Sequence, residues 1–247
     1  MARVIINGDD FGMNERCSRA IAQAFAKGLI TDTTAIANGE WLEDALQLAR
    51  DNGFSDKIGV HLNLTEGKPL TEKICGFTDF VTDGYFNKRA MTLNRELTAA
   101  ENDAVYAELE AQILRLKNAG IFITHADSHH YIHNLPCLLS VVVRVCRKHD
   151  INKLRLRKNL PDADAEINAY NATLRARGFI TTDYFGRPED ILGREIPDST
   201  ELLVHPDFDR DGELIDRRGM SDGYPIGDRF PDIGRMNGVE LIDYSLM

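Results

Sequence analysis

Short apolar, β-branched runs alternate with longer segments of helical periodicity along most of the chain. The runs predict buried strands, whereas apolar residues spaced three and four apart predict helices that cover a sheet. We expect strands at residues 3–7, 29–37, 57–64, 121–124, 153–157, 179–185, 201–205 and 239–244, and helices at 14–27, 40–51, 98–118, 138–149 and 168–177. This order predicts an α/β fold with a mostly parallel sheet, and the number of strand signals favours a (β/α) barrel, closed or incomplete.

Two segments lack a clear period. Residues 65–97 hold scattered Gly, Pro and aromatic residues. A loop of this length in a compact domain is usually functional or mobile, so we expect a lid or a substrate wall there. Residues 209–238 are crowded with Gly and Asp, and the pattern assigns nothing beyond loop there. No linker-like stretch divides the chain, so residues 1–247 are expected to form one barrel-like catalytic domain.

Composition narrows the class of protein and its partners. Hydrophobic residues are 43% and charged residues 28% of the chain, as in ordinary globular proteins. The net charge of −10 would repel a phosphate backbone, so nucleic acid is not an expected partner. The apolar stretch near residue 5 is too short for a signal peptide, and no run approaches roughly 18 apolar residues. We therefore expect a soluble cytoplasmic protein with no membrane partner.

The four cysteines do not form a recognisable metal motif. Cys17, Cys75, Cys137 and Cys146 have no CxxC spacing. A chain of 247 residues does not need disulfides to hold its core, so free thiols in a reducing compartment are expected.

Residues suited to chemistry stand where the predicted strands end. Asp9 and Asp10 follow the first strand, His61 lies late in the third, His125 follows the fourth, and His205 ends a later one. Active sites of parallel α/β folds lie at the carboxyl ends of the strands. An Asp pair is often only a turn, and a lone His is often a core residue. Because several segments bring such residues to one rim, a metal site with mixed His and Asp ligands is favoured.

The histidines are also clustered along the sequence. Four of the seven fall in residues 125–133, namely His125, His129, His130 and His133. Such a cluster is typical of metal and catalytic sites, although a solvated loop would also produce it.

Four motifs resemble those of the YdjC-type carbohydrate deacetylases. They are NGDDFG, IGVHLNLTEGKPL, THADSHHYIH and LLVHPDF, in the family's order and spacing from residue 1 to about 208. The resemblance implies a deformed, incomplete barrel, one divalent metal ion, usually recorded as magnesium, and removal of N-acetyl groups from short sugars such as chitooligosaccharides. The family usually continues from the last motif into a long helix, from which residues 209–238 depart.

The resemblance also implies roles for particular residues. It makes Asp10, His61 and His125 the metal ligands and Asp9 the base that activates water. Adjacent strand residues point to opposite faces, so both aspartates reach one site only if the backbone turns near residues 9–12, which Gly8 and Gly12 permit. Which aspartate is the base and which the ligand stays open.

The chemistry of amide hydrolysis suggests further residues. A metal with open positions acidifies water and polarises a carbonyl, and a general acid must protonate the leaving amine. His205 is the candidate acid and His129 the alternative. Asp127 is a candidate to fix a histidine tautomer. Arg155 is a candidate for binding a phosphate or sugar hydroxyls, but its strand of alternating Leu and Arg is equally typical of a half-solvated surface.

Several points are left open by the sequence. Imidazole ligands favour zinc or a similar ion, whereas the family resemblance implies magnesium. The substrate is expected to be a small acetylated sugar, with or without a phosphate. A homodimer is expected only because symmetric dimers are common. The alternative functions are a metal-dependent phosphoesterase and a sugar-binding protein without catalysis.

Overall fold

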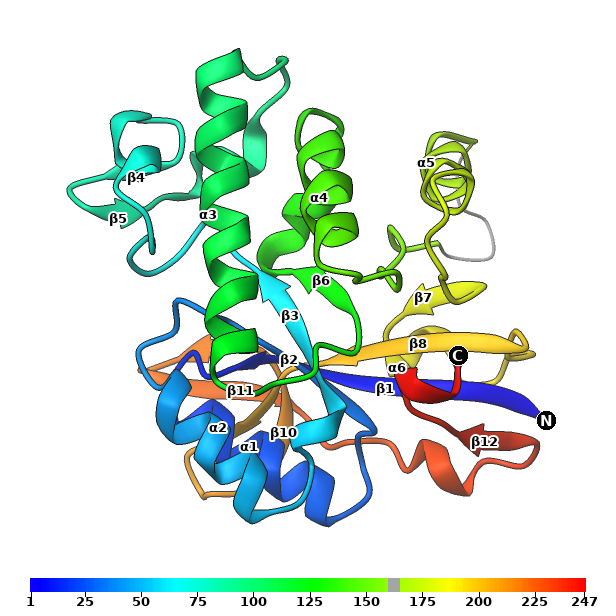
Figure 1. The fold of residues 1–247 in the computed structure, drawn as a ribbon. Helices are drawn as coiled ribbons and strands as arrows, with labels where there is room; N and C mark the ends of the chain where they lie inside the picture. Colours follow the sequence, from blue (N-terminus) through cyan, green and yellow to red (C-terminus); the bar gives the residue numbers. More distant parts are fainter. Residues whose placement is uncertain (160–164) are drawn as a thin grey trace.

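A curled, open parallel sheet forms the centre of the molecule (Figure 1). The computed structural model describes residues 1–159 and 165–247. The strand order is β6-β3-β2-β1-β8-β7, and β12 pairs with β1 outside this path. These strands are β1 (Ala2–Phe11), β2 (Asp32–Ala35), β3 (Ile58–Leu62), β6 (Ala126–Ser128), β7 (Tyr184–Gly186), β8 (Ser199–Val204) and β12 (Val239–Leu241). Every pairing in the sheet is parallel, which confirms an α/β fold with a deformed, incomplete barrel.

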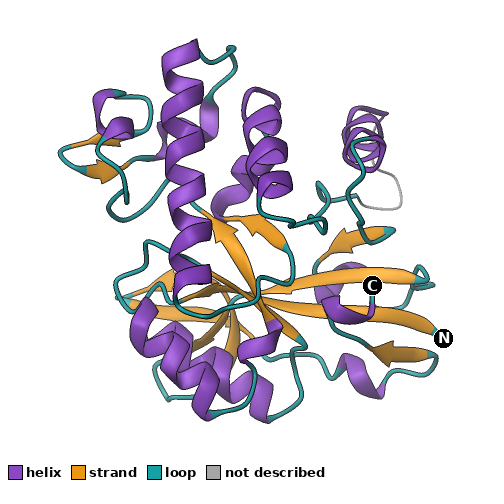
Figure 2. Ribbon diagram, viewed as in Figure 1, coloured by secondary structure: helices purple, strands orange, loops and turns teal. Residues whose placement is uncertain are grey.

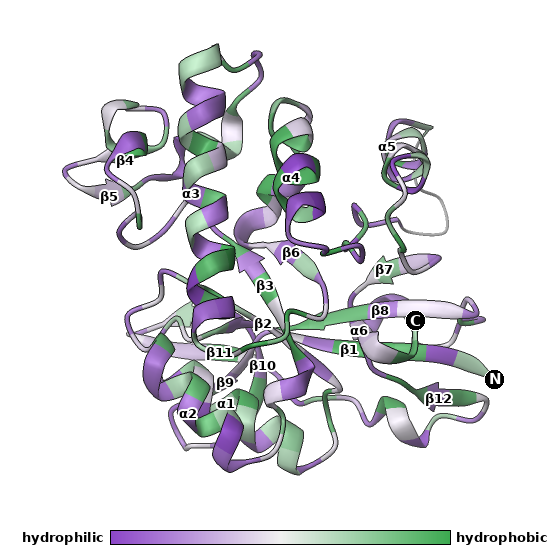
Figure 3. Cartoon of the chain, viewed as in Figure 1, coloured by the Kyte–Doolittle hydropathy of each residue, from purple (hydrophilic) through white to green (hydrophobic). Residues whose placement is uncertain are grey.

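Helices lie around this sheet (Figure 2). They are α1 (Glu15–Ala26), α2 (Leu42–Asp51), α3 (Ala99–Asn118), α4 (Pro136–Lys148), α5 (Ala165–Ala176) and the short α6 (Pro188–Ile191). Figure 3 shows hydrophobic and hydrophilic positions alternating along α3 and α4, as expected of helices with one buried side. The α3 helix begins at a capping box in which Thr98 and Glu101 bond each other's backbone N–H groups. The predicted helices at 14–27, 40–51, 98–118, 138–149 and 168–177 are therefore confirmed.

One strand lies further along the chain than the sequence predicted. The pattern indicated a strand at 121–124, whereas β6 covers Ala126–Ser128 and pairs with β3 through His61 and Asp127. The carboxyl end of this strand is therefore at Ser128 and not at Thr124. The predicted strand at 153–157 forms only isolated bridges, through Lys153 and Leu154.

The segment 209–238, to which the sequence pattern assigns only loop, contains strands of a second sheet. A second sheet, with order β11-β10-β9, is built from β9 (Pro206–Phe208), β10 (Leu214–Ser221) and β11 (Tyr224–Asp228). Asp222 and Gly223 form the hairpin turn with φ of 50° and 79°, the conformation that Asp-Gly favours. Much of the hairpin is solvent-exposed and polar, so no hydrophobic alternation marks its strands.

The irregular segment 65–97 contains a small hairpin and two helical turns. The hairpin joins β4 (Val81–Thr82) to β5 (Tyr85–Phe86), and 3-10 turns lie at Lys73–Gly76 and Lys88–Thr92. Further 3-10 turns lie at Ser55–Lys57, His129–Asn134, Ile233–Arg235 and Tyr244–Leu246.

The structure also bears on the cysteines and on membrane-spanning helices. The cysteines are all free, and three of the four are buried. No helix in the described part of the chain is long and apolar enough to cross a membrane.

Candidate metal centre and active site

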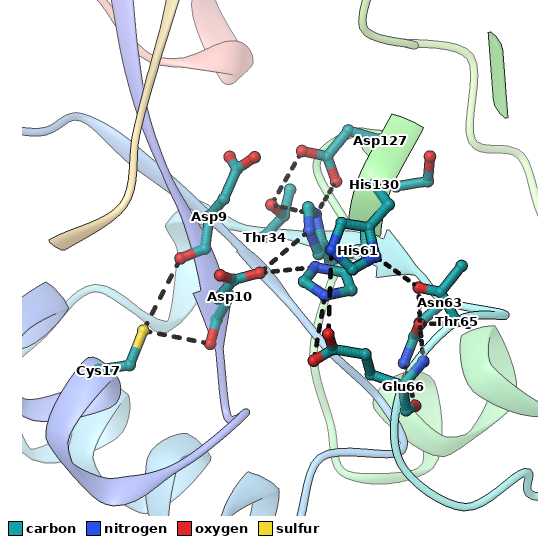
Figure 4. A network of polar contacts seen from close by, with 12 residues as sticks. Asp9, Asp10, Cys17, Thr34, His61, Asn63, Thr65, Glu66, Asp127 and His130 are labelled. Carbon is teal, nitrogen blue, oxygen red and sulfur yellow. Dashed lines mark hydrogen bonds and ion pairs between the residues drawn. The ribbon is translucent and has the colours of Figure 1, made fainter. Parts of the chain in front are cut away.

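Asp10, His61 and His129 converge at the carboxyl ends of β1, β3 and β6. Oδ1 of Asp10 lies 3.4 Å from Nε2 of His61 and 2.9 Å from Nδ1 of His129. All three side chains are buried, and one ligand atom from each lies within 4.8 Å of the others. Figure 4 shows Asp10 and His61 facing each other across this space. Two imidazoles and one carboxylate in this arrangement can hold a divalent cation.

The backbone of β1 brings both adjacent aspartates to the site. The pairing of β1 with β2 shifts register between Gly8 and Phe11. Asp10 lies in this irregular stretch with φ of 74°, a left-handed conformation that non-glycine residues adopt at a cost. The turn expected near residues 9–12 is thus present, and it lets Asp9 and Asp10 face the same region.

His125 does not join this group, and we replace it by His129 as the proposed ligand. Because β6 begins at Ala126, His125 precedes the strand and His129 follows its carboxyl end. Nε2 of His125 lies 3.1 Å from Oδ1 of Asn7, and the ring stacks on Tyr244 with centroids 3.7 Å apart. Burial holds the pKa of His125 well below its usual value, as suits a neutral core residue.

Asp127 orients His61 and not His125. Oδ1 of Asp127 lies 2.6 Å from Nδ1 of His61, and Oγ1 of Thr34 donates to Oδ2 of Asp127 at 3.0 Å. Nε2 of His61 is thereby left facing Asp10, the arrangement found for histidine ligands of metals. Burial would lower the pKa of His61, but the carboxylates around it outweigh burial and raise the pKa to about 10. The negative charge at this site can therefore be balanced by a proton or by a cation.

Asp9 is held in its charged form by Arg155. Nη1 and Nη2 of Arg155 each donate to one carboxylate oxygen of Asp9 at 2.8 Å, and Nδ2 of Asn7 donates to Oδ1 at 2.8 Å. Burial acts to raise the pKa of Asp9, but Arg155 outweighs it and holds the pKa well below its usual range. Arg155 is itself only 1% exposed, so the half-solvated strand is ruled out and its guanidinium binds protein carboxylates.

His205 lies directly after β8, beside the two aspartates. Its Nδ1 is buried without a hydrogen-bond partner among the described residues. Burial lowers the pKa of His205, although the charges of Asp10 and Asp9 oppose this change. His205 therefore keeps an unpaired ring nitrogen close to the aspartates and stays a candidate proton donor.

The β10 strand supplies a residue that sequence reasoning missed. Nη2 of Arg217 donates to Oδ2 of Asp10 at 2.8 Å, while Nη1 lies 3.3 Å from Oδ2 of Asp207. Arg217 could not be found from sequence because its strand was taken for loop.

Glu66 was also missed, although it lies in the quoted motif IGVHLNLTEGKPL. Its Oε2 is 3.5 Å from Nε2 of His129, and its Oε1 is 3.9 Å from Nε2 of His130. The contact with His129 lowers the pKa of Glu66 to about 2, against the effect of burial. Asn63 holds the loop in place, because its side chain donates to the Glu66 carbonyl at 2.7 Å. Glu66, His129 and His130 therefore form a second group of possible metal ligands, next to the Asp10, His61 and His129 group.

A family model described as YdjC-like protein matches residues 3–228. The chain belongs to this family. The match confirms the resemblance seen in the sequence motifs, and membership suggests a carbohydrate-processing hydrolase. The matched region includes Asp9, Asp10 and Arg217.

Two solved structures are similar to this chain. One is a protein from Enterococcus faecalis V583, provisionally assigned to cellobiose-phosphate cleavage. It has 28% sequence identity and a TM-score of 0.69, and the match covers 84% of this chain and 82% of that one. The other is a lactam utilization protein from Thermus thermophilus, with 17% identity, a TM-score of 0.45 and coverage of 82% and 90%.

Proposed function

We propose that this protein is a metal-dependent hydrolase that removes N-acetyl groups from small acetylated sugars of the chitooligosaccharide type. One observation carries the proposal: a buried Asp10, His61 and His129 group lies beside a second carboxylate, Asp9, that is held ionised by an arginine. A cation site next to an ionised carboxylate is suited to amide hydrolysis, because the cation can activate water and the carboxylate can accept its proton.

The donor atoms fit a divalent cation. Oδ1 of Asp10 is a buried carboxylate oxygen with no well-formed hydrogen bond in the described part of the chain, and it faces Nδ1 of His129 at 2.9 Å and Nε2 of His61 at 3.4 Å. Unpaired buried polar atoms are costly, and a bound ion would compensate them. Asp10, His61 and His129 would hold the ion. Their chemistry favours zinc or a similar transition ion, and the family resemblance implies magnesium, so the proposal covers both.

The remaining steps are assigned to side chains. When bound, the cation would acidify a water molecule and polarise the acetyl carbonyl. Asp9, kept ionised by Arg155, accepts the proton of the attacking water. His205 donates a proton to the departing amine nitrogen, and its lowered pKa makes the protonated ring a stronger acid. Asp127 keeps His61 in the tautomer that exposes Nε2 to the site.

The proposal also covers the substrate, the cellular location and the oligomeric state. The substrate is a small sugar, and both phosphorylated and unphosphorylated forms belong in the test, because the similar Enterococcus faecalis protein is linked to a phosphorylated disaccharide. A cytoplasmic location and a homodimer stay predictions from the sequence and from base rates.

The test is acetate release by chelated protein that is supplied separately with magnesium, zinc, manganese or cobalt. N-acetylated mono- and disaccharides, with and without phosphate, serve as substrates. We expect one or more metals to restore acetate release, and Asp9→Asn and His61→Ala to abolish it while the fold survives.

A matched control is His149→Ala, because His149 pairs with Glu110 at 3.1 Å on the outer helices and should leave activity unchanged. Phosphate release without acetate would overturn the proposal in favour of a phosphoesterase. Sugar binding without turnover under every metal would overturn it in favour of a binding protein.

A further inference from the structure

The carboxyl-terminal tail, residues 242–247, lies against β1 and β8 (Figure 1). Tyr244 is 1% exposed, its ring stacks on His125, and its backbone N–H donates to Oδ1 of Asp32 at 3.2 Å. Lys57 and Asp243 add an ion pair at 2.7 Å, and Lys153 donates to the carbonyl of Tyr244. The tail thus fills a defined place in the interior.

The hydroxyl of Tyr244 begins a continuous chain of buried polar contacts that ends at Asp9. It donates to Oε2 of Glu201 at 2.6 Å. The other carboxylate oxygen of Glu201 accepts from Nε of Arg155 at 2.7 Å. The two terminal nitrogens of the same guanidinium bind Asp9.

This series of contacts fixes the orientation of the Arg155 guanidinium. A guanidinium is planar, so a bond at Nε fixes how its terminal nitrogens are turned. Glu201 binds one edge of the guanidinium, and the two carboxylate oxygens of Asp9 bind the other. Nη1 also lies 2.6 Å from Oδ2 of Asp127. Burial raises the pKa of Glu201, whereas Arg155 and the Tyr244 hydroxyl oppose that change and favour its ionised form.

We propose that Tyr244 is a positioning residue for Asp9, acting through Glu201 and Arg155, so that the carboxyl-terminal tail completes the catalytic arrangement. The inference rests on the proposed function, because it assumes that Asp9 is the base. It also separates two roles of Tyr244: the ring packs on His125, and the hydroxyl orients the guanidinium.

The test compares Tyr244→Phe, Glu201→Gln and the double variant with the wild type. Tyr244→Phe keeps the ring and removes only the hydroxyl. We expect kcat for acetate release to fall about tenfold, as for the loss of one hydrogen bond to a charged group, with KM unchanged. We expect little further fall when Tyr244→Phe is added to Glu201→Gln, because the hydroxyl acts through that carboxylate.

Two readouts separate positioning from a general loss of structure. Calorimetric titration with Mn²⁺ should give the same affinity in wild type and Tyr244→Phe, since no ligand is changed. Tyr170→Phe is the matched control, because its hydroxyl is also buried but donates to the backbone carbonyl of His133. We expect this control to retain the wild-type kcat.

The outcomes distinguish failure of this inference from failure of the proposed function. No acetate release by wild type refutes the proposed function itself. With an active wild type, a Tyr244→Phe kcat within twofold of normal refutes the inference, as does an equal loss in the Glu201→Gln background or a parallel loss of Mn²⁺ affinity. If Tyr244→Phe does not fold, Glu201→Gln alone must lower kcat at unchanged KM and Mn²⁺ affinity, or the inference fails.

Discussion

Replacing His129 and His125 in turn distinguishes a metal ligand from a buried core residue. The two rings lie at opposite ends of β6, and only His129 lies next to Asp10, with Nδ1 2.9 Å from Oδ1. A structural zinc ion held by four protein ligands is bound with about 10–16 kcal/mol, so one ligand accounts for about 3 kcal/mol. That energy corresponds to roughly a hundredfold change in the dissociation constant. We therefore expect His129→Ala to weaken metal binding by about two orders of magnitude.

The same substitution at His125 should act on stability instead. Its ring is completely buried, stacks on Tyr244 and bonds Asn7, so His125→Ala leaves a cavity and an unpaired amide oxygen. The cost is about 3 kcal/mol, which lowers the melting temperature by roughly 10 °C in a chain of this length. Metal affinity of the folded fraction should change less than fivefold.

The assay is calorimetric titration of chelated protein with Zn²⁺ and Mn²⁺, together with thermal unfolding of the apoprotein. Measuring the apoprotein keeps bound metal from contributing to the melting temperature. Loss of metal affinity in His125→Ala, with normal affinity in His129→Ala, would refute our reassignment of the ligand and restore the original expectation.

Three further predictions concern the support of the site and the fold. Asp127→Asn should weaken metal binding by about 10- to 100-fold through misorientation of His61, and unchanged calorimetric affinity would contradict this role. The pKa of the buried Asp32 is raised by burial to about 8, so folding favours its protonated form, and the free energy of unfolding should fall between about pH 4 and pH 8. Asp32→Asn should make the free energy of unfolding depend less on pH, by up to about 1.4 kcal/mol per pH unit. Urea unfolding at several pH values measures this dependence, and an unaltered dependence would contradict the prediction. Thr98→Ala breaks the capping box of α3 and should lower stability by about 1 kcal/mol with no effect on metal affinity, as urea unfolding and calorimetry would show.

The order of strands and helices could be predicted from the sequence because it depends on local periodicity. The helix at 98–118 is an example, since its apolar spacing and its terminal Gly120 are both local signals. Strand ends are less well determined, because pairing with a neighbour decides them. The sequence pattern ended this strand four residues too early, so His125 was expected to follow it, whereas His129 follows it in the structure.

The sequence by itself determined the fold class, the family and the residue types of the candidate site, because these depend on patterns and motifs within short stretches of chain. Only the tertiary structure decided which histidine faces Asp10, and that Arg217 and Glu66 border the site. It also decided that Tyr244 reaches Arg155 through Glu201. These contacts join residues that are far apart in sequence, and their formation depends on strand pairing and on burial that no local pattern records.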